Sequence, residues 1–522
     1  TRDLAESVDR TLRRCYRLCL GVDPLDPNGH SDGQEDPSFV SDLFTLKVAR
    51  GGGGFRPTTA RAHFLNTLNT IAPQLMATEH STGLWPSLKS IFGEGSFEDS
   101  NRANRWAAFY ASGSRYAQAL ASEWKRLQTM LNDAATAAQL ELSSNPVLDA
   151  DVNAFGHGAP KLHKHVFDEL QRLLFEVVRR RALALPRDDP RRMAFSASAN
   201  DKISNQIFAG TPNEDCIFSP REWCSAVQNK LGLPQSYLMP FIGRPITNNA
   251  NCPTAQVDAY GHSIKTVTGA TGDGTRRLHD SMNDGTSIWF DQAGIPHIGG
   301  CKGLKRTCKD RFSQALNSLP ENDPQTRRYI QGIIPDLCVD GTGRELDEKA
   351  KKVLGDHGRA LFDWKTLAPG KAYSETASTE FAAVANKRQI EVTRQYRTTA
   401  KHLDAKLGTP PDEIGPVETE LNTYNSGAVV GLVAGAFGEM SEGVHCITSF
   451  IASELASDHL QFFALDPGMV RSIFLRRVRR SLGLKAHRGW AKLLLDRTRD
   501  LVQHPNQPRN ARTTDEDDAE AH

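Results

Sequence analysis

Two short apolar runs in the middle of the chain, each next to or containing an acidic residue, constrain the fold most strongly. Residues 329–339 and 360–367 are rich in β-branched, aromatic and other apolar residues, which is typical of buried strands. A polar segment at 340–358 separates them, so the sequence predicts two neighbouring strands joined by a loop. We expect Asp336 near the end of the first strand, and Asp363 inside the second.

The spacing within the second run predicts a chemical site. Residues i and i+2 of a strand share a face, so Asp363 and Lys365 point together while Trp364 points into packing. If the two strands pair as a hairpin, Asp336 reaches the same patch. Paired carboxylates hold a hard divalent cation, and a neighbouring lysine can stabilise the charge that develops in phosphodiester cleavage.

We therefore predict Asp336 and Asp363 as ligands of Mg²⁺ (or Mn²⁺), and these two with Lys365 as the catalytic residues. A purely structural arrangement remains open at this stage. In it, Asp336 caps a turn and the Asp363–Lys365 pair is a solvated ion pair.

Basic residues gather on two predicted helices, although the whole chain is nearly neutral, with 63 Lys and Arg against 62 Asp and Glu. Near neutrality excludes a uniformly basic surface, so contact with nucleic acid requires local patches. One patch lies on the predicted helix 380–407 and the other on the helix 469–502. The residues predicted to bind nucleic acid are Arg394, Arg397, Lys401, Arg476, Arg477 and Arg480. An ordinary surface helix is the alternative for the first patch, and a membrane surface or an acidic partner for the second.

Composition and patterning divide the chain into segments. Nine cysteines without a CxxC pair indicate a reducing, intracellular setting, and the most apolar run, 428–437, is too short to span a membrane. Because the first residue is Thr, we expect the sequence to be a fragment of a longer protein. The predicted segments are 1–100 (poorly patterned, partly disordered, with one short helix), 101–190 (helical), 191–250 (helical linker), 251–460 (α/β core), 461–504 (basic helical tail) and 505–522 (disordered acidic tail).

The order of several short motifs resembles a known family. The chain resembles the PD-(D/E)xK nuclease superfamily, and from about residue 190 to 500 the restriction-like endonuclease region that follows the reverse transcriptase in some non-LTR retrotransposon polyproteins. The matching pieces are Asn200-Asp201-Lys202-Ile203-Ser204 to Pro212, Phe218-Ser219-Pro220-Arg221-Glu222-Trp223, Lys230-Leu231-Gly232-Leu233-Pro234, Asp258-Ala259-Tyr260-Gly261-His262, Arg276-Arg277-Leu278-His279-Asp280, Ala293-Gly294, Pro335-Asp336, Asp363-Trp364-Lys365, Phe437-Gly438-Glu439 and Arg488-Gly489-Trp490-Ala491.

The resemblance implies an α/β fold with a mixed-sheet, restriction-endonuclease-like core flanked by helices and preceded by a mainly helical N-terminal region. It also implies a metal-dependent DNA endonuclease, nuclear in a eukaryote, whose target-site nick primes retrotransposition. No Tyr/Phe-x-Asp-Asp polymerase motif is present, so a reverse-transcriptase module is expected upstream as a missing partner. DNA is the expected substrate, and no membrane partner is expected.

The chain also departs from the family pattern. The upstream acid common in the superfamily is not evident, and Asp310 is a poor substitute for it. Zinc needs ligands at defined spacing, which the residues around Cys252 do not provide, so we predict no zinc site. We expect His262 and His279 to be buried hydrogen-bonding residues that hold a Gly-rich loop. The alternatives to the enzyme are a catalytically inactive nuclease fold that binds nucleic acid or scaffolds a complex, and an unrelated α/β regulatory protein.

Overall fold

A four-stranded mixed sheet organises the C-terminal part of the chain in this computed structural model. Its order is β1-β2-β3-β4, with antiparallel pairing of β1 with β2 and of β2 with β3, and parallel pairing of β3 with β4. The parallel pair requires a long crossover, which helix α16 provides. The strands are β1 (His297–Gly299), β2 (Leu337–Asp340), β3 (Arg359–Thr366) and β4 (Val429–Ala434).

The structure describes most of the second half of the chain and parts of the first. The described ranges are 132–141, 155–209, 217–246, 255–267, 273–299, 333–340, 359–376, 382–423, 429–463 and 465–503, with isolated residues elsewhere. The chain forms two units, Thr1–Ala184 and Leu185–His522. Most of the predicted segment 1–100, and the predicted acidic tail 505–522, lie outside the described residues.

Helices make up most of the remaining structure. The N-terminal unit contains α7 (Phe155–Ala184), whose Leu173 packs with Ala135 and Ala138. The helices of the C-terminal unit are α8 (Pro190–Ser198), η3 (Ser204–Phe208), α9 (Pro220–Leu231), η5 (Ser236–Phe241), α10 (His262–Lys265), α11 (Asp273–Gln292), α15 (Lys371–Thr376), α16 (Ala383–Lys406), α17 (Pro416–Asn422), α18 (Glu442–His459), η7 (Leu460–Phe462), α19 (Pro467–Thr498) and η8 (Arg499–Gln503).

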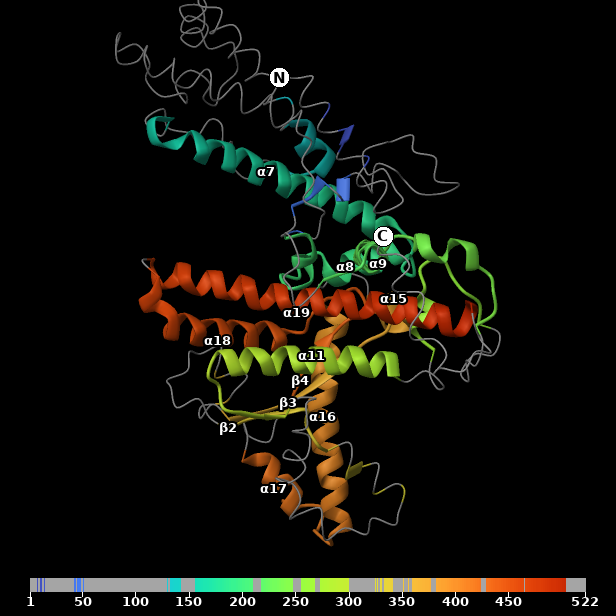
Figure 1. Cartoon of the computed structure of the whole chain (residues 1–522), viewed down its shortest axis with the longest axis vertical. Coiled ribbons are helices and arrows are strands. Elements are labelled where there is room, and N and C mark those ends of the chain that lie inside the picture. The colour runs from blue at the N-terminus through green and yellow to red at the C-terminus, as the bar shows by residue number, and fades with distance from the viewer. Residues whose placement is uncertain are drawn as a thin grey trace, which may run out of the picture. The chain divides into compact units, whose positions relative to one another are not determined.

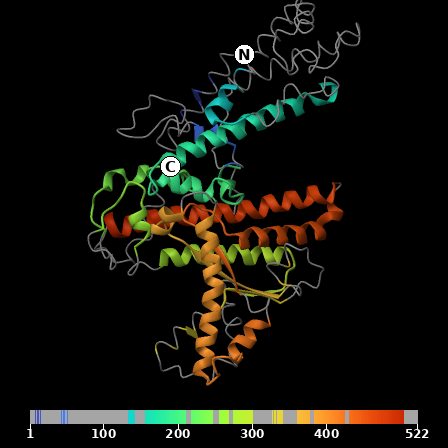
Figure 2. The ribbon, with the colours of Figure 1, turned by 180° about the vertical axis from the view of Figure 1, so that it is seen from behind.

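The two faces of the sheet are covered by different helices. Leu361 and Val429 pack with residues of α16 on one face. Phe362, Trp364 and Leu432 pack with α11, α18 and α19 on the other. In Figures 1 and 2, α11, α18 and α19 run side by side and α16 crosses their direction. The sheet is therefore a layer between one helix and a group of three.

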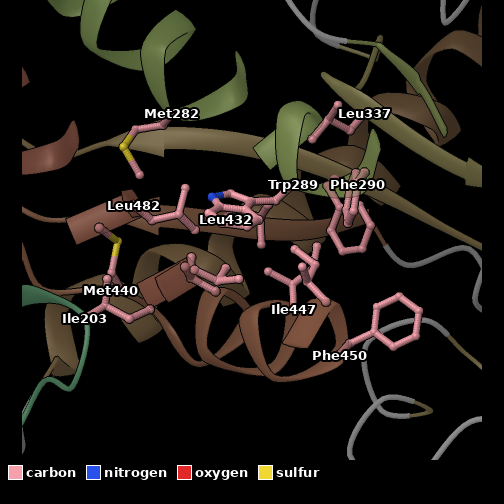
Figure 3. Close-up of a cluster of buried hydrophobic side chains, with 14 of the residues drawn as sticks. Ile203, Met282, Trp289, Phe290, Leu337, Leu432, Met440, Ile447, Phe450 and Leu482 are labelled. Carbon is pink, nitrogen blue, oxygen red and sulfur yellow. The ribbon is translucent and has the colours of Figure 1, made fainter. Parts of the chain in front are cut away.

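The larger core lies under the three helices. Figure 3 shows Leu432, from β4, among Trp289, Ile447 and Leu482, which come from α11, α18 and α19 respectively. These side chains are at most 5% exposed, so their burial removes apolar surface from water at roughly 25 cal/mol per Å². Ile203, from the segment expected to be a linker, is buried in the same cluster.

Several sequence predictions agree with the structure. The antiparallel pairing of β2 with β3 is found, with Leu337 opposite Phe362. The predicted strand 360–367 and the predicted helices 380–407 and 469–502 correspond to β3, α16 and α19. The mixed α/β class is thus confirmed. Within the described residues, no helix combines the length and apolar character that crossing a bilayer requires.

One local prediction needs correction, and two helices add to what the sequence indicated. The strand expected at 329–339 is much shorter, because Tyr329 and Ile330 are helical and β2 begins only at Leu337. Asp336 therefore precedes its strand rather than ending it. Residues 273–292, within the segment predicted as the α/β core, form the helix α11. The predicted basic helix 469–502, α19, is a core element with Trp490 fully buried.

Candidate metal centre

Asp336 is fixed beside the middle of β3 by the way β2 begins. Its backbone N–H donates to the Phe362 carbonyl at 2.9 Å, and its Oδ2 accepts from the Trp364 N–H at 2.8 Å. The carboxylate therefore takes the place that a backbone acceptor would hold in the strand ladder. This position sets the Asp336 side chain next to that of Asp363.

Asp363 and Lys365 lie on β3 as the alternation predicts. Lys365 Nζ is 2.6 Å from Asp363 Oδ2, while the Trp364 ring packs on the opposite face in the larger core. The Asp363 side chain is 5% exposed and that of Lys365 is 34% exposed. A buried carboxylate thus holds a lysine whose side chain reaches solvent.

His279 completes the group, and sequence reasoning missed it. It lies on α11, where its Nε2 is 3.0 Å from Asp336 Oδ2 and its Nδ1 is 3.3 Å from Asp280. The expectation that it holds a Gly-rich loop is wrong, because the surrounding residues are helical and its ring faces a carboxylate. The only sequence signal was its place in the motif Arg276 to Asp280.

The close approach of α11 to α19 explains how His279 comes to the sheet. A Cβ on Gly489 of α19 would lie 2.3 Å from Leu278 Cδ1, so a side chain there would push the helices apart. A Cβ on Gly285 of α11 would likewise lie 2.9 Å from Lys485 Cδ. Gly285 also lowers the helix propensity of α11, which weakens the local sequence signal for this helix.

Ligand atoms of His279, Asp336 and Asp363 all lie within 4.8 Å of one another. Asp310 lies outside the described residues, and within those described no other group of three His, Cys, Asp or Glu side chains comes together in this way. Cys252, considered as a zinc ligand, also lies outside them, whereas His262 begins α10 with its ring near Tyr260 and Phe437.

The two carboxyl groups have opposite electrostatic environments. Burial raises the pKa of Asp363 to about 7, and the charge of Asp336 acts in the same direction, against the attraction of Lys365. Burial also acts to raise the pKa of Asp336, but its hydrogen bonds from His279 and the Trp364 amide lower that pKa below its ordinary value. Burial acts to lower the pKa of His279, but its bond to Asp336 raises it overall.

Tyr396 of α16 lies beside the site, on the sheet face that α16 covers. Its hydroxyl donates to the Ile334 carbonyl at 3.3 Å, and the ring is 4% exposed. Burial, followed by the charges of Asp363 and Asp336, raises its pKa well above the ordinary value, so it remains a protonated donor. The sequence gave no sign that Tyr396 lies beside the carboxylates.

The donor set fits a divalent cation. Carboxylate oxygens suit Mg²⁺ and Mn²⁺, and the imidazole of His279 adds a ligand that Mn²⁺ accepts more readily than Mg²⁺. The raised pKa of Asp363 is the mark of two carboxyl groups held together in a buried place. A cation between His279, Asp336 and Asp363 would relieve that repulsion.

The predicted nucleic-acid-binding residues do not form one surface. Arg394, Arg397 and Lys401 are exposed on α16, which covers the sheet face shared by Asp363. The others belong to α19, which covers the opposite face, and only two of them are exposed. Of the three residues predicted on α19, Arg476 and Arg477 are exposed and Arg480 is half-buried.

Comparisons of the chain with protein-family models, with curated proteins and with solved structures found no match.

Proposed function

We propose that this chain is a divalent-metal-dependent DNA endonuclease. The observation that carries the proposal is the meeting of His279, Asp336 and Asp363 within 4.8 Å, with Lys365 beside Asp363. A four-stranded mixed sheet flanked by helices supports the coarser part of the expected fold, its mixed α/β class. We further propose the role that this resemblance suggests, a target-site nick made for an upstream reverse transcriptase, in the nucleus of a eukaryote.

Each residue has a distinct task in this proposal. Asp336 and Asp363 hold the cation, and His279 is the third ligand in the place where an acid was expected. When bound, the cation supplies positive charge that polarises the scissile phosphodiester. Lys365, paired with Asp363 and one-third exposed, would stabilise negative charge on the phosphoryl oxygens. Tyr396 keeps its proton and holds the turn before Asp336 in place.

The test is plasmid nicking by the purified protein in Mg²⁺ or Mn²⁺. We expect nicked product from the parent, more of it in Mn²⁺ because of His279, and a loss of at least 100-fold in Asp363→Asn. A matched control is Asp404→Asn, since Asp404 is a buried acid of α16 that accepts N–H bonds from Val417 and Glu418. Equal nicking by the parent and Asp363→Asn would remove the assignment.

A second candidate is a nuclease fold that binds nucleic acid without cutting it. The observation favouring it is that the charges of the site already pair internally: Lys365 with Asp363, and His279 with Asp336. Binding of DNA by the parent without nicking in any of Mg²⁺, Mn²⁺ and Co²⁺ would select this candidate.

A further inference from the structure

One exposed face of α16 carries a row of four cations with one apolar residue among them. Successive members are spaced three or four residues apart, which places them in one row along a helix. The row consists of Lys387, Ile390, Arg394, Arg397 and Lys401, all of them exposed. We call these residues the α16 ridge. Its ends are 14 residues apart, or about 21 Å at a rise of ~1.5 Å per residue.

The cations of the α16 ridge are not neutralised by neighbouring acids. Within the described residues none of the four forms an ion pair, and Glu391, on the same helix, is engaged by Arg388 at 3.1 Å. Like charges at this spacing repel one another and slightly destabilise the helix. A row that carries this cost without an internal counter-charge is suited to an external polyanion.

The opposite side of the same helix is fastened to the candidate metal centre. Tyr396 bonds the Ile334 carbonyl, two residues before Asp336. Gly431, the register partner of Asp363, lies so close to α16 that a Cβ on it would be 3.0 Å from Gln389 Cα. A ligand bound along the α16 ridge is thus held by a helix that contacts both the turn before Asp336 and the strand next to Asp363.

We propose that the α16 ridge binds the phosphate backbone of duplex nucleic acid. The proposal rests on the proposed function for its substrate class, and it assigns the contact to α16 rather than to the predicted patch on α19. A membrane surface is disfavoured because the apolar face of α16 is buried against the sheet. An acidic protein is disfavoured because Ile390 is the ridge's only exposed apolar residue, whereas protein interfaces centre on larger apolar anchors.

The test measures binding in the absence of cleavage. In an Asp363→Asn background with chelator, the affinity for a 30-base-pair duplex is measured as a function of salt. The slope of log K against log salt is negative, and each lost phosphate contact makes it less steep by about 0.9. Arg394→Gln/Arg397→Gln should therefore make it less steep by about 1.8, so that the affinity lost between 50 and 200 mM salt becomes about 12-fold smaller.

The matched control is Arg476→Gln/Arg477→Gln, which removes the same charge from exposed positions of α19. We expect it to change the slope by less than half as much. An equal or larger change in this control would overturn the proposal. An affinity of the protein for a polyglutamate chain equal to its affinity for the duplex would overturn it as well. Circular dichroism and melting temperature check that both double variants are folded.

The two proposals fail separately. If the unaltered protein nicks DNA but the ridge variant binds like its parent, the α16 ridge is refuted and the enzyme stands. If the ridge variant loses salt-dependent binding but no cation supports nicking by the unaltered protein, the enzyme is refuted and the ridge stands.

Discussion

The two carboxyl groups of the candidate metal centre should respond in opposite ways to the same substitution. We consider Asp363→Asn and Asp336→Asn, each isosteric and each removing one carboxylate, in protein free of metal. The pKa of Asp363 is raised to about 7, whereas that of Asp336 is lowered. Folding therefore disfavours the ionised form of Asp363 and favours that of Asp336.

The magnitude for Asp363 follows from its pKa. The ordinary value is about 3.9, so the folded protein loses ~1.4 kcal/mol of stability per pH unit as the pH rises from about 4 to about 7, or ~4 kcal/mol in all. Asp363→Asn removes this loss, which already includes the attraction of Lys365, but it also buries an amide N–H group beside Lys365 at a cost of about 2 kcal/mol. We expect the variant to be about 2 kcal/mol more stable than the parent at pH 8. That advantage should shrink by roughly 2–3 kcal/mol at pH 5, where the parent's carboxyl group is protonated.

Asp336→Asn is the internal control, because we expect it to change the stability in the opposite direction. Because its pKa is lowered by folding, ionised Asp336 contributes stability that is present above its ordinary pKa and lost as the pH falls through the folded value. Asn can still accept from the Trp364 N–H, but it loses the charge that His279 pairs with. We expect this variant to be less stable than the parent at pH 8.

The assay is thermal unfolding in chelator at pH 5 and pH 8, followed by calorimetry. At about 2–4 °C per kcal/mol, the expected rise for Asp363→Asn at pH 8 is roughly 4–8 °C. Addition of Mn²⁺ should then raise the melting temperature of the parent and not that of the variant, because a ligand stabilises only the fold that binds it. A lower melting temperature for Asp363→Asn at pH 8 in chelator would refute the reasoning about a strained carboxylate pair.

Two further predictions concern the packing that holds the site. Trp490→Phe leaves the buried Gly435 carbonyl without the indole N–H that lies 2.8 Å away, so we expect a loss of about 1–3 kcal/mol in urea unfolding; a Trp490→Phe variant as stable as the parent would contradict it. Gly431→Val should cost about 1–3 kcal/mol, because even a Cβ at position 431 would lie 3.0 Å from Val392 Cβ. An unchanged urea midpoint there would show that α16 is free to move away from β4.

The sequence alone was enough for much of the sheet. Apolar composition located β3, and the alternation of side chains put Asp363 and Lys365 on one face with Trp364 on the other. The predicted helix 380–407 was found as α16, and Arg394, Arg397 and Lys401 are exposed on it. These features depend on neighbours within a few residues, so local rules predict them.

The sequence by itself determined which residue types were available for a metal centre, but only the tertiary structure decided which of them meet. His279 reaches Asp336 because glycines let α11 and α19 pack closely, a contact between residues about 200 positions apart that no local pattern contains. The predicted basic patches were likewise separated by the fold, since α16 and α19 cover opposite faces of one sheet. The physical reason is the same in both cases: the free energy of burying apolar surface between distant segments outweighs local preference, and it places the polar groups that those segments carry.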